Sequence, residues 1–299
     1  MSVRGKSITL FLMDGTPNGR FKCTLPNWTG VVYKIPRTEL EKCKGRDDLS
    51  QSGVYFLFGT SDQTGEAVVY VGQAGVRKNG EGILYRLQEH KRNPDKDYWN
   101  EAVVFTTSNN SFGPTEISYL ESRFTAMATA AKRYVVKNAN EPTLGGKPTE
   151  EKECELEEFI DYAKIAIEVL GHKVFEPLSQ QPLAEPAHEE KQDEPEKLFV
   201  IDRSGADAKA RLTNEGVVVL AGSIIRKEIV PSCRGHVKTI RDDNRDYIDE
   251  NGMLHRDILF KTPSGAASFV LGSPANGNQE WHTPDGKTLK AIESKGTID

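Results

Sequence analysis

Residues 53–72 read GVYFLFGTSDQTGEAVVYVG, and this stretch decides the fold. The run 54–58 is apolar at almost every position, which indicates a central strand covered on both faces. The polar, glycine-containing stretch 59–66 predicts a turn. The run 68–71 is apolar again and forms the returning strand. The sequence therefore predicts a β-hairpin that carries one tyrosine on each strand.

Helical and strand signals continue after the hairpin. A short helix near residues 83–90 places Arg86 and His90 four positions apart, and so on one side. Residues 102–106 form a third strand. Thr115 is the expected N-cap of a long helix, because apolar residues follow it at helical spacing.

A second long helix runs from the expected N-cap Thr149 to the stop signal Gly171. Glutamates fill its first turns, where the helix dipole favours anions. Before the hairpin, residues 8–12 and 31–33 read as strands, and a short helix starts at Pro36.

The chain is expected to be α+β, with a small antiparallel sheet flanked by helices and a separate small α+β C-terminal domain. The segment between the two is rich in Pro, Gln, Glu and Ala and too polar to bury a core, which is typical of a linker. The expected segments are a strand-rich extension at 1–52, a main domain at 53–148, a packing helix at 149–176, a linker at 177–196 and a C-terminal domain at 197–299.

The C-terminal domain contains a weak internal repeat. Residues 199–202 precede Ser204-Gly205-Ala206, and residues 258–260 precede Ser264-Gly265-Ala266. Each half predicts a strand followed by a Ser-capped short helix, although chance explains three shared letters. The histidines of this domain are scattered among turn residues, so we expect no catalytic set there.

The net charge of −5 is concentrated in one part of the chain. Lys and Arg minus Asp and Glu give +4 for 1–52, 0 for 53–150, −10 for 151–196 and +1 for 197–299. Outside the acidic segment the chain is neutral to mildly basic. This permits phosphate binding without arguing for it, because strong nucleic-acid binders usually show a basic face.

The cysteines Cys23, Cys43, Cys154 and Cys233 are far apart. Their spacing argues against a zinc knuckle or a disulfide framework and fits reduced thiols. No run approaches the ~20 apolar residues that a membrane helix requires, and the first residues do not read as a signal peptide. We therefore expect a cytoplasmic protein that does not associate with membranes.

Side chains suited to phosphodiester hydrolysis follow the hairpin in order. Tyr55 and Tyr70 offer a proton acceptor, Arg86 a fixed cation for a phosphate, and Glu121 an oxygen ligand for a metal. A free phenol has a pKa near 10, so only about one in 10³ is ionised at pH 7. A nearby cation stabilises the ionised form and so brings the pKa of the phenol closer to 7.

Residues 53–141 resemble the GIY-YIG nuclease family. The signature tripeptides here are Gly53-Val54-Tyr55 and Tyr70-Val71-Gly72. The residues that follow in the family's order are Arg86, His90, Glu121 after Leu120, and Asn140. The hairpin turn and the stretch 72–86 look longer than is usual in the family, and the extra residues 76–80 are expected to form an exposed loop.

The resemblance implies a metal-dependent endonuclease that cuts nucleic acid, with DNA as the expected substrate. It implies that Tyr55, Tyr70, Arg86, His90 and Glu121 are catalytic and that Glu121 binds one Mg²⁺ or Mn²⁺. Gly72 and Asn140 would contact substrate, with Asn138 an equally placed alternative to Asn140. The stretches 205–223 and 264–281 are similar to a family of unknown function that is often appended to such nucleases.

Each of these residues also has a plain structural explanation. Tyr55 can be a core tyrosine, Arg86 a surface partner of Glu89, and His90 a surface histidine. Glu121 can form an interhelical salt bridge. Two alternatives to the enzyme therefore stay open: a nuclease-like scaffold that binds nucleic acid without cutting it, and a protein-interaction scaffold.

Overall fold

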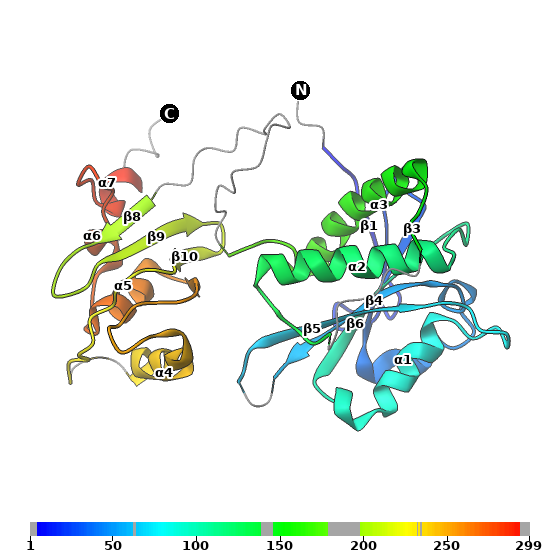
Figure 1. Cartoon of the computed structure of the whole chain (residues 1–299), viewed down its shortest axis with the longest axis horizontal. Helices are drawn as coiled ribbons and strands as arrows, with labels where there is room; N and C mark the ends of the chain where they lie inside the picture. The colour runs from blue at the N-terminus through cyan, green and yellow to red at the C-terminus, as the bar shows by residue number, and fades with distance from the viewer. Residues whose placement is uncertain are drawn as a thin grey trace. The chain divides into compact units, whose positions relative to one another are not determined.

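The chain folds into two units, Met1–Pro177 and Leu178–Asp299, and each combines a β-sheet with helices (Figure 1). The computed structural model describes residues 5–61, 64–138, 146–178, 198–231, 233 and 235–293. The α+β class expected from the sequence is confirmed. Across these ranges, no helix combines the length and the hydropathy needed to cross a bilayer.

A mixed seven-stranded sheet with the order β1-β2-β3-β6-β4-β5-β7 forms the centre of the first unit. Neighbouring strands are antiparallel except β5 and β7, which run parallel. The sheet is thus larger than the small antiparallel sheet expected, because strands from residues 9–36 join it through β3 and β6. The strands are β1 (Thr9–Leu12), β2 (Phe21–Thr24), β3 (Gly30–Pro36), β4 (Gly53–Thr60), β5 (Ala67–Ala74), β6 (Trp99–Thr107) and β7 (Val135–Val136).

Strand β4 lies inside this sheet and is covered on both faces, as its apolar run predicts. Because successive side chains point to opposite faces, Phe56 and Phe58 enter one core and Tyr55 and Leu57 enter another. The first core includes side chains of α2 (Pro114–Ala131) and α3 (Glu150–Val169). The second includes side chains of α1 (Ile83–Arg92) and of the 3₁₀ helices η1 (Arg37–Cys43) and η2 (Asp47–Leu49). Figure 1 shows α2 and α1 on opposite sides of the sheet.

The two long helices begin at different kinds of cap. Helix α3 starts as predicted, because the Thr149 hydroxyl accepts a hydrogen bond from the Lys152 N–H at 3.4 Å. For α2 the predicted cap, Thr115, is wrong by two residues. The N-cap is Gly113, whose N–H donates to the Glu116 carboxylate at 3.0 Å, and proline occupies the first helical position.

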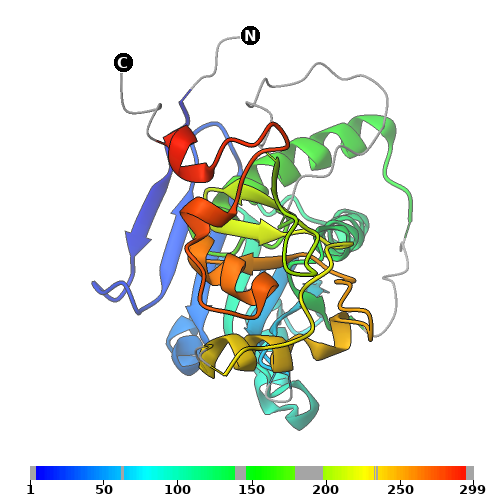
Figure 2. The same cartoon turned by 90° about the vertical axis from the view of Figure 1, so that its left-hand side faces the viewer.

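Strand β1 forms one edge of the sheet and pairs only with β2 among the described strands (Figure 2). All four of its residues are exposed, including the apolar Leu10, Phe11 and Leu12. The opposite edge is formed by the two-residue strand β7. It pairs with β5 only at Val68 and Val69, so β7 does not cover the later part of β5.

The second unit is an antiparallel four-stranded sheet with the order β11-β10-β9-β8, packed against short helices around Phe269 and Trp281. Its strands are β8 (Leu198–Ile201), β9 (Ala208–Thr213), β10 (Gly216–Val219) and β11 (Ile258–Phe260). Its helices are α4 (Gly235–Asp243), α5 (Pro263–Leu271), α6 (Gly277–Glu280) and α7 (Leu289–Glu293).

Only the second half of the internal repeat contains the predicted helix. Helix α5 follows β11, and its cap is Thr262 rather than Ser264. The helix predicted at residues 204–206 is wrong, because Ser204 and Gly205 both have positive φ angles, of 57° and 80°. Consecutive left-handed residues make a turn and cannot start an α-helix.

Candidate functional site

The β4–β5 hairpin places the two tyrosines on one face of the sheet. Tyr55 pairs with Gly72 and Leu57 pairs with Tyr70, so the two phenols are diagonal neighbours. Their ring centroids lie 6.3 Å apart. Tyr55 is completely buried, whereas Tyr70 is half-buried. Burial raises the pKa of both phenols, and the charge of Arg86 opposes the rise in each.

Gly72 is required where it stands because the Tyr55 ring lies over it. A β-carbon at this position would lie 2.5 Å from the Tyr55 hydroxyl oxygen and 2.8 Å from a Tyr70 ring carbon. Real β-carbons do not approach other atoms this closely. Gly72, which was predicted to contact substrate, therefore has a structural role: without a side chain it leaves space for the two phenol rings.

We expect Gly72→Ala to lower the free energy of unfolding by about 1–3 kcal/mol, because the new methyl group overpacks the space between the two rings. Urea unfolding measures the effect. Gly75→Ala is the matched control, since its β-carbon would meet nothing closer than Ile117 at 3.8 Å. Equal stability of the two variants would contradict the role assigned to Gly72.

His90 is a buried partner of Tyr55 and not the surface residue that an isolated helical histidine suggests. It projects from α1 with only 3% of its surface exposed. Its Nε2 and the Tyr55 hydroxyl share a hydrogen bond of 2.6 Å. Burial, together with the charges of Lys96 and Arg86, lowers the pKa of His90 to about 3. The imidazole is therefore neutral at pH 7.

Arg86 lies beside the phenols but is also paired with Glu89. Its Nη1 donates to Glu89 Oε2 at 2.8 Å, which is the structural partner that the sequence allowed. Glu89 additionally accepts two hydrogen bonds from Arg77, at 2.9 and 3.0 Å. Arg77 belongs to the loop after β5, so this loop is tied to α1 through the Glu89 carboxylate. The Arg86 side chain remains 41% exposed.

Glu121 approaches the phenols from α2. Its Oε2 accepts a hydrogen bond from Gln73 Nε2 at 2.8 Å, and Gln73 directly follows Gly72 on β5. In the described ranges the Glu121 carboxylate forms no ion pair, so the interhelical salt bridge considered from the sequence is absent there. Burial raises the pKa of Glu121, while the Gln73 bond and the charges of Arg86 and Lys96 oppose the rise.

Glu121 can provide one oxygen ligand for an Mg²⁺ or Mn²⁺ ion, and the other ligands would have to come from water or substrate. The described residues contain no group of three or more His, Cys, Asp or Glu side chains placed to hold a metal. A closed zinc site needs three or four protein ligands and does not fit. Magnesium commonly uses one or two carboxylates and completes its shell with water and substrate phosphate. Glu121, with one carboxylate oxygen bound to Gln73, can supply such a ligand.

Of the two asparagines considered, only Asn138 lies within the described residues. Its side chain accepts from the Val71 N–H at 3.1 Å and donates to the Val71 carbonyl at 2.8 Å. It thereby replaces a strand partner at the edge of β5, beyond the short pairing with β7. Asn140 lies outside the described residues, so its contact with substrate stays a prediction.

Sequence reasoning missed Gln73 and Lys96. Gln73 could have been found, because it directly follows the second tripeptide. Lys96 lies in the 3₁₀ turn η3 (Pro94–Lys96) after α1, and no spacing rule links it to the hairpin. Its Nζ lies 3.4 Å from the centroid of the Tyr70 ring.

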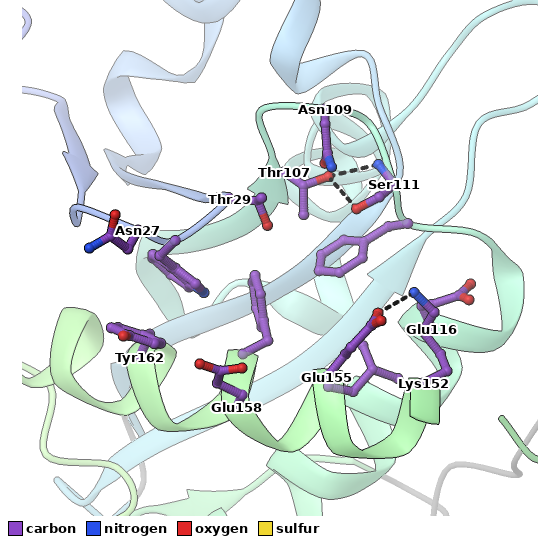
Figure 3. A pocket seen from close by; sticks show the side chains of 14 residues that line it. Asn27, Thr29, Thr107, Asn109, Ser111, Glu116, Lys152, Glu155, Glu158 and Tyr162 are labelled. Carbon is purple, nitrogen blue, oxygen red and sulfur yellow. Dashed lines mark hydrogen bonds and ion pairs between the residues drawn. The ribbon is translucent and has the colours of Figure 1, made fainter. Parts of the chain in front are cut away.

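A separate pocket of about 320 Å³ lies between α3 and the loops that precede β3 and follow β6 (Figure 3). None of the predicted site residues lines it. Aromatic side chains meet there, with Trp28 stacked on Tyr162 at 5.8 Å between centroids. Glu155 at its rim is paired with Lys152 at 2.5 Å.

Comparison with known proteins bears on the C-terminal unit. A family model described as a domain of unknown function (DUF4357) matches residues 199–293. No curated protein matches the chain. No solved structure matches it either. The C-terminal stretch is therefore similar to a family whose function is itself unassigned, and the GIY-YIG resemblance of residues 53–141 stays a prediction.

Proposed function

We propose that the first unit is a metal-dependent nuclease of GIY-YIG type that hydrolyses phosphodiesters in nucleic acid, with DNA as the substrate to test first. One observation carries the proposal. Side chains from four elements meet around the hairpin. The rings of Tyr55 on β4 and Tyr70 on β5 lie 6.3 Å apart. His90 of α1, one turn after Arg86, is bonded to the Tyr55 hydroxyl, and Glu121 of α2 is bonded to Gln73, which follows Gly72 on β5. If each of these residues had only a structural role of its own, they would not need to lie close to one another.

Burial assigns different roles to the two phenols. Tyr55 has no exposed surface and its hydroxyl is bonded to His90, so an attacking water cannot reach it directly. Tyr70 is half-buried, and its ring contacts Lys96, whose ammonium nitrogen lies 3.4 Å from the ring centroid. We therefore assign Tyr70 as the general base: its hydroxyl first loses its own proton to solvent, which the neighbouring cations favour, and the resulting phenolate accepts the proton of the attacking water. Tyr55 and His90 hold the ring of Tyr70 in place from the core side.

Arg86 and Glu121 supply the charges. Arg86, still 41% exposed, binds the non-bridging oxygens of the phosphate while Glu89 orients its guanidinium. Glu121 would hold the divalent ion with its carboxylate, and Gln73 fixes the orientation of that carboxylate. A bound Mg²⁺ or Mn²⁺ would supply positive charge for the leaving oxygen.

The test is cleavage of supercoiled plasmid, single-stranded DNA and RNA by the purified protein with Mg²⁺, with Mn²⁺ and with EDTA. We expect products only with a metal. We expect Glu121→Gln to slow cleavage by about 10²-fold, since a lost metal contact costs several kcal/mol. The control is Glu155→Gln, which removes an exposed carboxylate of α3. Cleavage in EDTA, or equal rates for the two variants, would contradict the proposal.

The alternative function is binding without cleavage. The pairing of Arg86 with Glu89 favours it, because the guanidinium that catalysis would need is already engaged. It predicts DNA affinity that falls steeply with salt and no products with either metal. A protein-interaction scaffold predicts no affinity for nucleic acid.

A further inference from the structure

Lys96 is a cation placed within the candidate site by a short turn. Its N–H donates to the Asn93 carbonyl at 3.1 Å, closing the turn that follows α1. This turn sets the Lys96 Nζ 3.4 Å from the Tyr70 ring centroid. The His90 ring packs against the same ring in a T-shaped arrangement, with the two centroids 5.4 Å apart. Tyr70 is thus in contact with a neutral imidazole and with an ammonium group.

The ammonium of Lys96 has no anionic partner in the described part of the chain. Its side chain forms no ion pair and no hydrogen bond there, although it is half-buried. Partial burial of an unpaired charge is unfavourable, and a cation–π contact offsets only about 1–2 kcal/mol. Burial and the charge of Arg86 lower the pKa of Lys96 to about 8, and the charge of Glu121 opposes this. An incoming anion would complete the environment of Lys96.

We propose that Lys96 is a substrate-binding residue of this site, whose ammonium binds a phosphate oxygen of the nucleic-acid backbone beside the face of Tyr70, as a second phosphate contact besides Arg86. The inference rests on the proposed function, because it takes nucleic acid as the anion. It adds a contact from η3 that the hairpin and α1 do not provide. A purely structural role would be limited to the Lys96–Tyr70 contact and would leave the ionic contacts to DNA unchanged.

The first test measures ionic contacts without cleavage. A fluorescent 20-base-pair DNA duplex is titrated in EDTA at several salt concentrations with wild type, Lys96→Met and Lys96→Arg. Lys96→Met keeps the apolar stem over Tyr70 and removes the charge. We expect it to reduce the slope of log affinity against log salt by about 0.9, the value for one lost phosphate contact. Lys96→Arg should keep the wild-type slope.

The matched control is Lys164→Gln, which removes an exposed lysine from α3. A second measurement needs no variant of the site. Acetic anhydride labels lysines of the wild-type protein with and without the duplex, and mass spectrometry reads each position. We expect DNA to protect Lys96 from acetylation at least severalfold and to leave Lys164 unprotected.

The outcomes separate the two proposals. DNA binding by the wild type with an unchanged slope in Lys96→Met, or without protection of Lys96, overturns the inference and leaves the proposed function standing. A wild-type protein that binds no DNA in the presence or absence of metal overturns both. A reduced slope together with protection supports Lys96 even if no cleavage is seen.

Discussion

Replacing Tyr70 with phenylalanine is expected to slow metal-dependent DNA cleavage by about 10³-fold, which is within the range for loss of a general base. Tyr70 is the phenol that solvent can reach, and it lies next to Lys96 and close enough to Arg86 and Glu121 for their charges to act on its pKa. Removal of its hydroxyl deletes the proton acceptor and keeps the ring on which Lys96 and His90 rest. The fold should therefore be unaffected.

Tyr55→Phe should behave differently. The buried His90 loses its hydrogen-bond partner, which costs about 1–3 kcal/mol of stability, while the rate falls by roughly tenfold. Tyr85→Phe on α1 is the matched control, because Tyr85 stacks with the arginines Arg77 and Arg92 rather than with the site. Single-turnover rates and urea unfolding of the three variants decide the assignment. A large rate loss in Tyr55→Phe with near-normal Tyr70→Phe would reverse the roles of the two phenols.

Acid should destabilise the first unit through His90. The folded-state pKa of His90 is about 3, below the ordinary value near 6.5, so between these values the unfolded chain binds a proton that the folded chain does not. Stability from this group is complete above pH 6.5 and is lost as the pH falls toward 3. The largest slope for one proton is about 1.4 kcal/mol per pH unit.

The measurement compares wild type with His90→Gln, which can keep a hydrogen bond to Tyr55 but does not titrate. We expect the difference in unfolding free energy between the two proteins to shift by up to about 2 kcal/mol in favour of His90→Gln between pH 7 and pH 5. His255→Gln, an exposed histidine of the second unit, serves as the control. Parallel pH curves for wild type and His90→Gln would show that His90 titrates normally.

Local pattern was sufficient for the hairpin and the long helices, because those signals lie within a few residues. The apolar run in β4 predicts burial on both faces, and Thr149 predicts the start of α3. The pairing of strands that are distant in the sequence could not be predicted. Nothing near Val31 indicates that β3 pairs with β6 about 70 residues later, and so the sheet was expected to be smaller.

The candidate site was also predictable only in part from local sequence. The order of Tyr55, Tyr70, Arg86 and Glu121 predicts a common site. In the structure the two phenols lie 6.3 Å apart, and Glu121 is bonded to Gln73 beside them on β5. Their exposure could not be predicted. Tyr55 is hidden and Tyr70 is not, because of which strand lies nearer the sheet edge, and this depends on tertiary structure. Lys96 reaches the site through a turn whose position depends on how α1 packs.

The ladder between β3 and β6 has a practical consequence for anyone who wishes to isolate a minimal fragment that contains the candidate site. Seven residue pairs join the two strands, from Gly30 opposite Thr107 to Pro36 opposite Glu101. A chain that starts at residue 53 would leave one side of β6 without hydrogen-bonding partners. It would also expose to solvent the side chains that the missing strands bury. The smallest autonomous piece must therefore begin upstream of the GIY-YIG-like segment, among strands that carry no chemistry of their own.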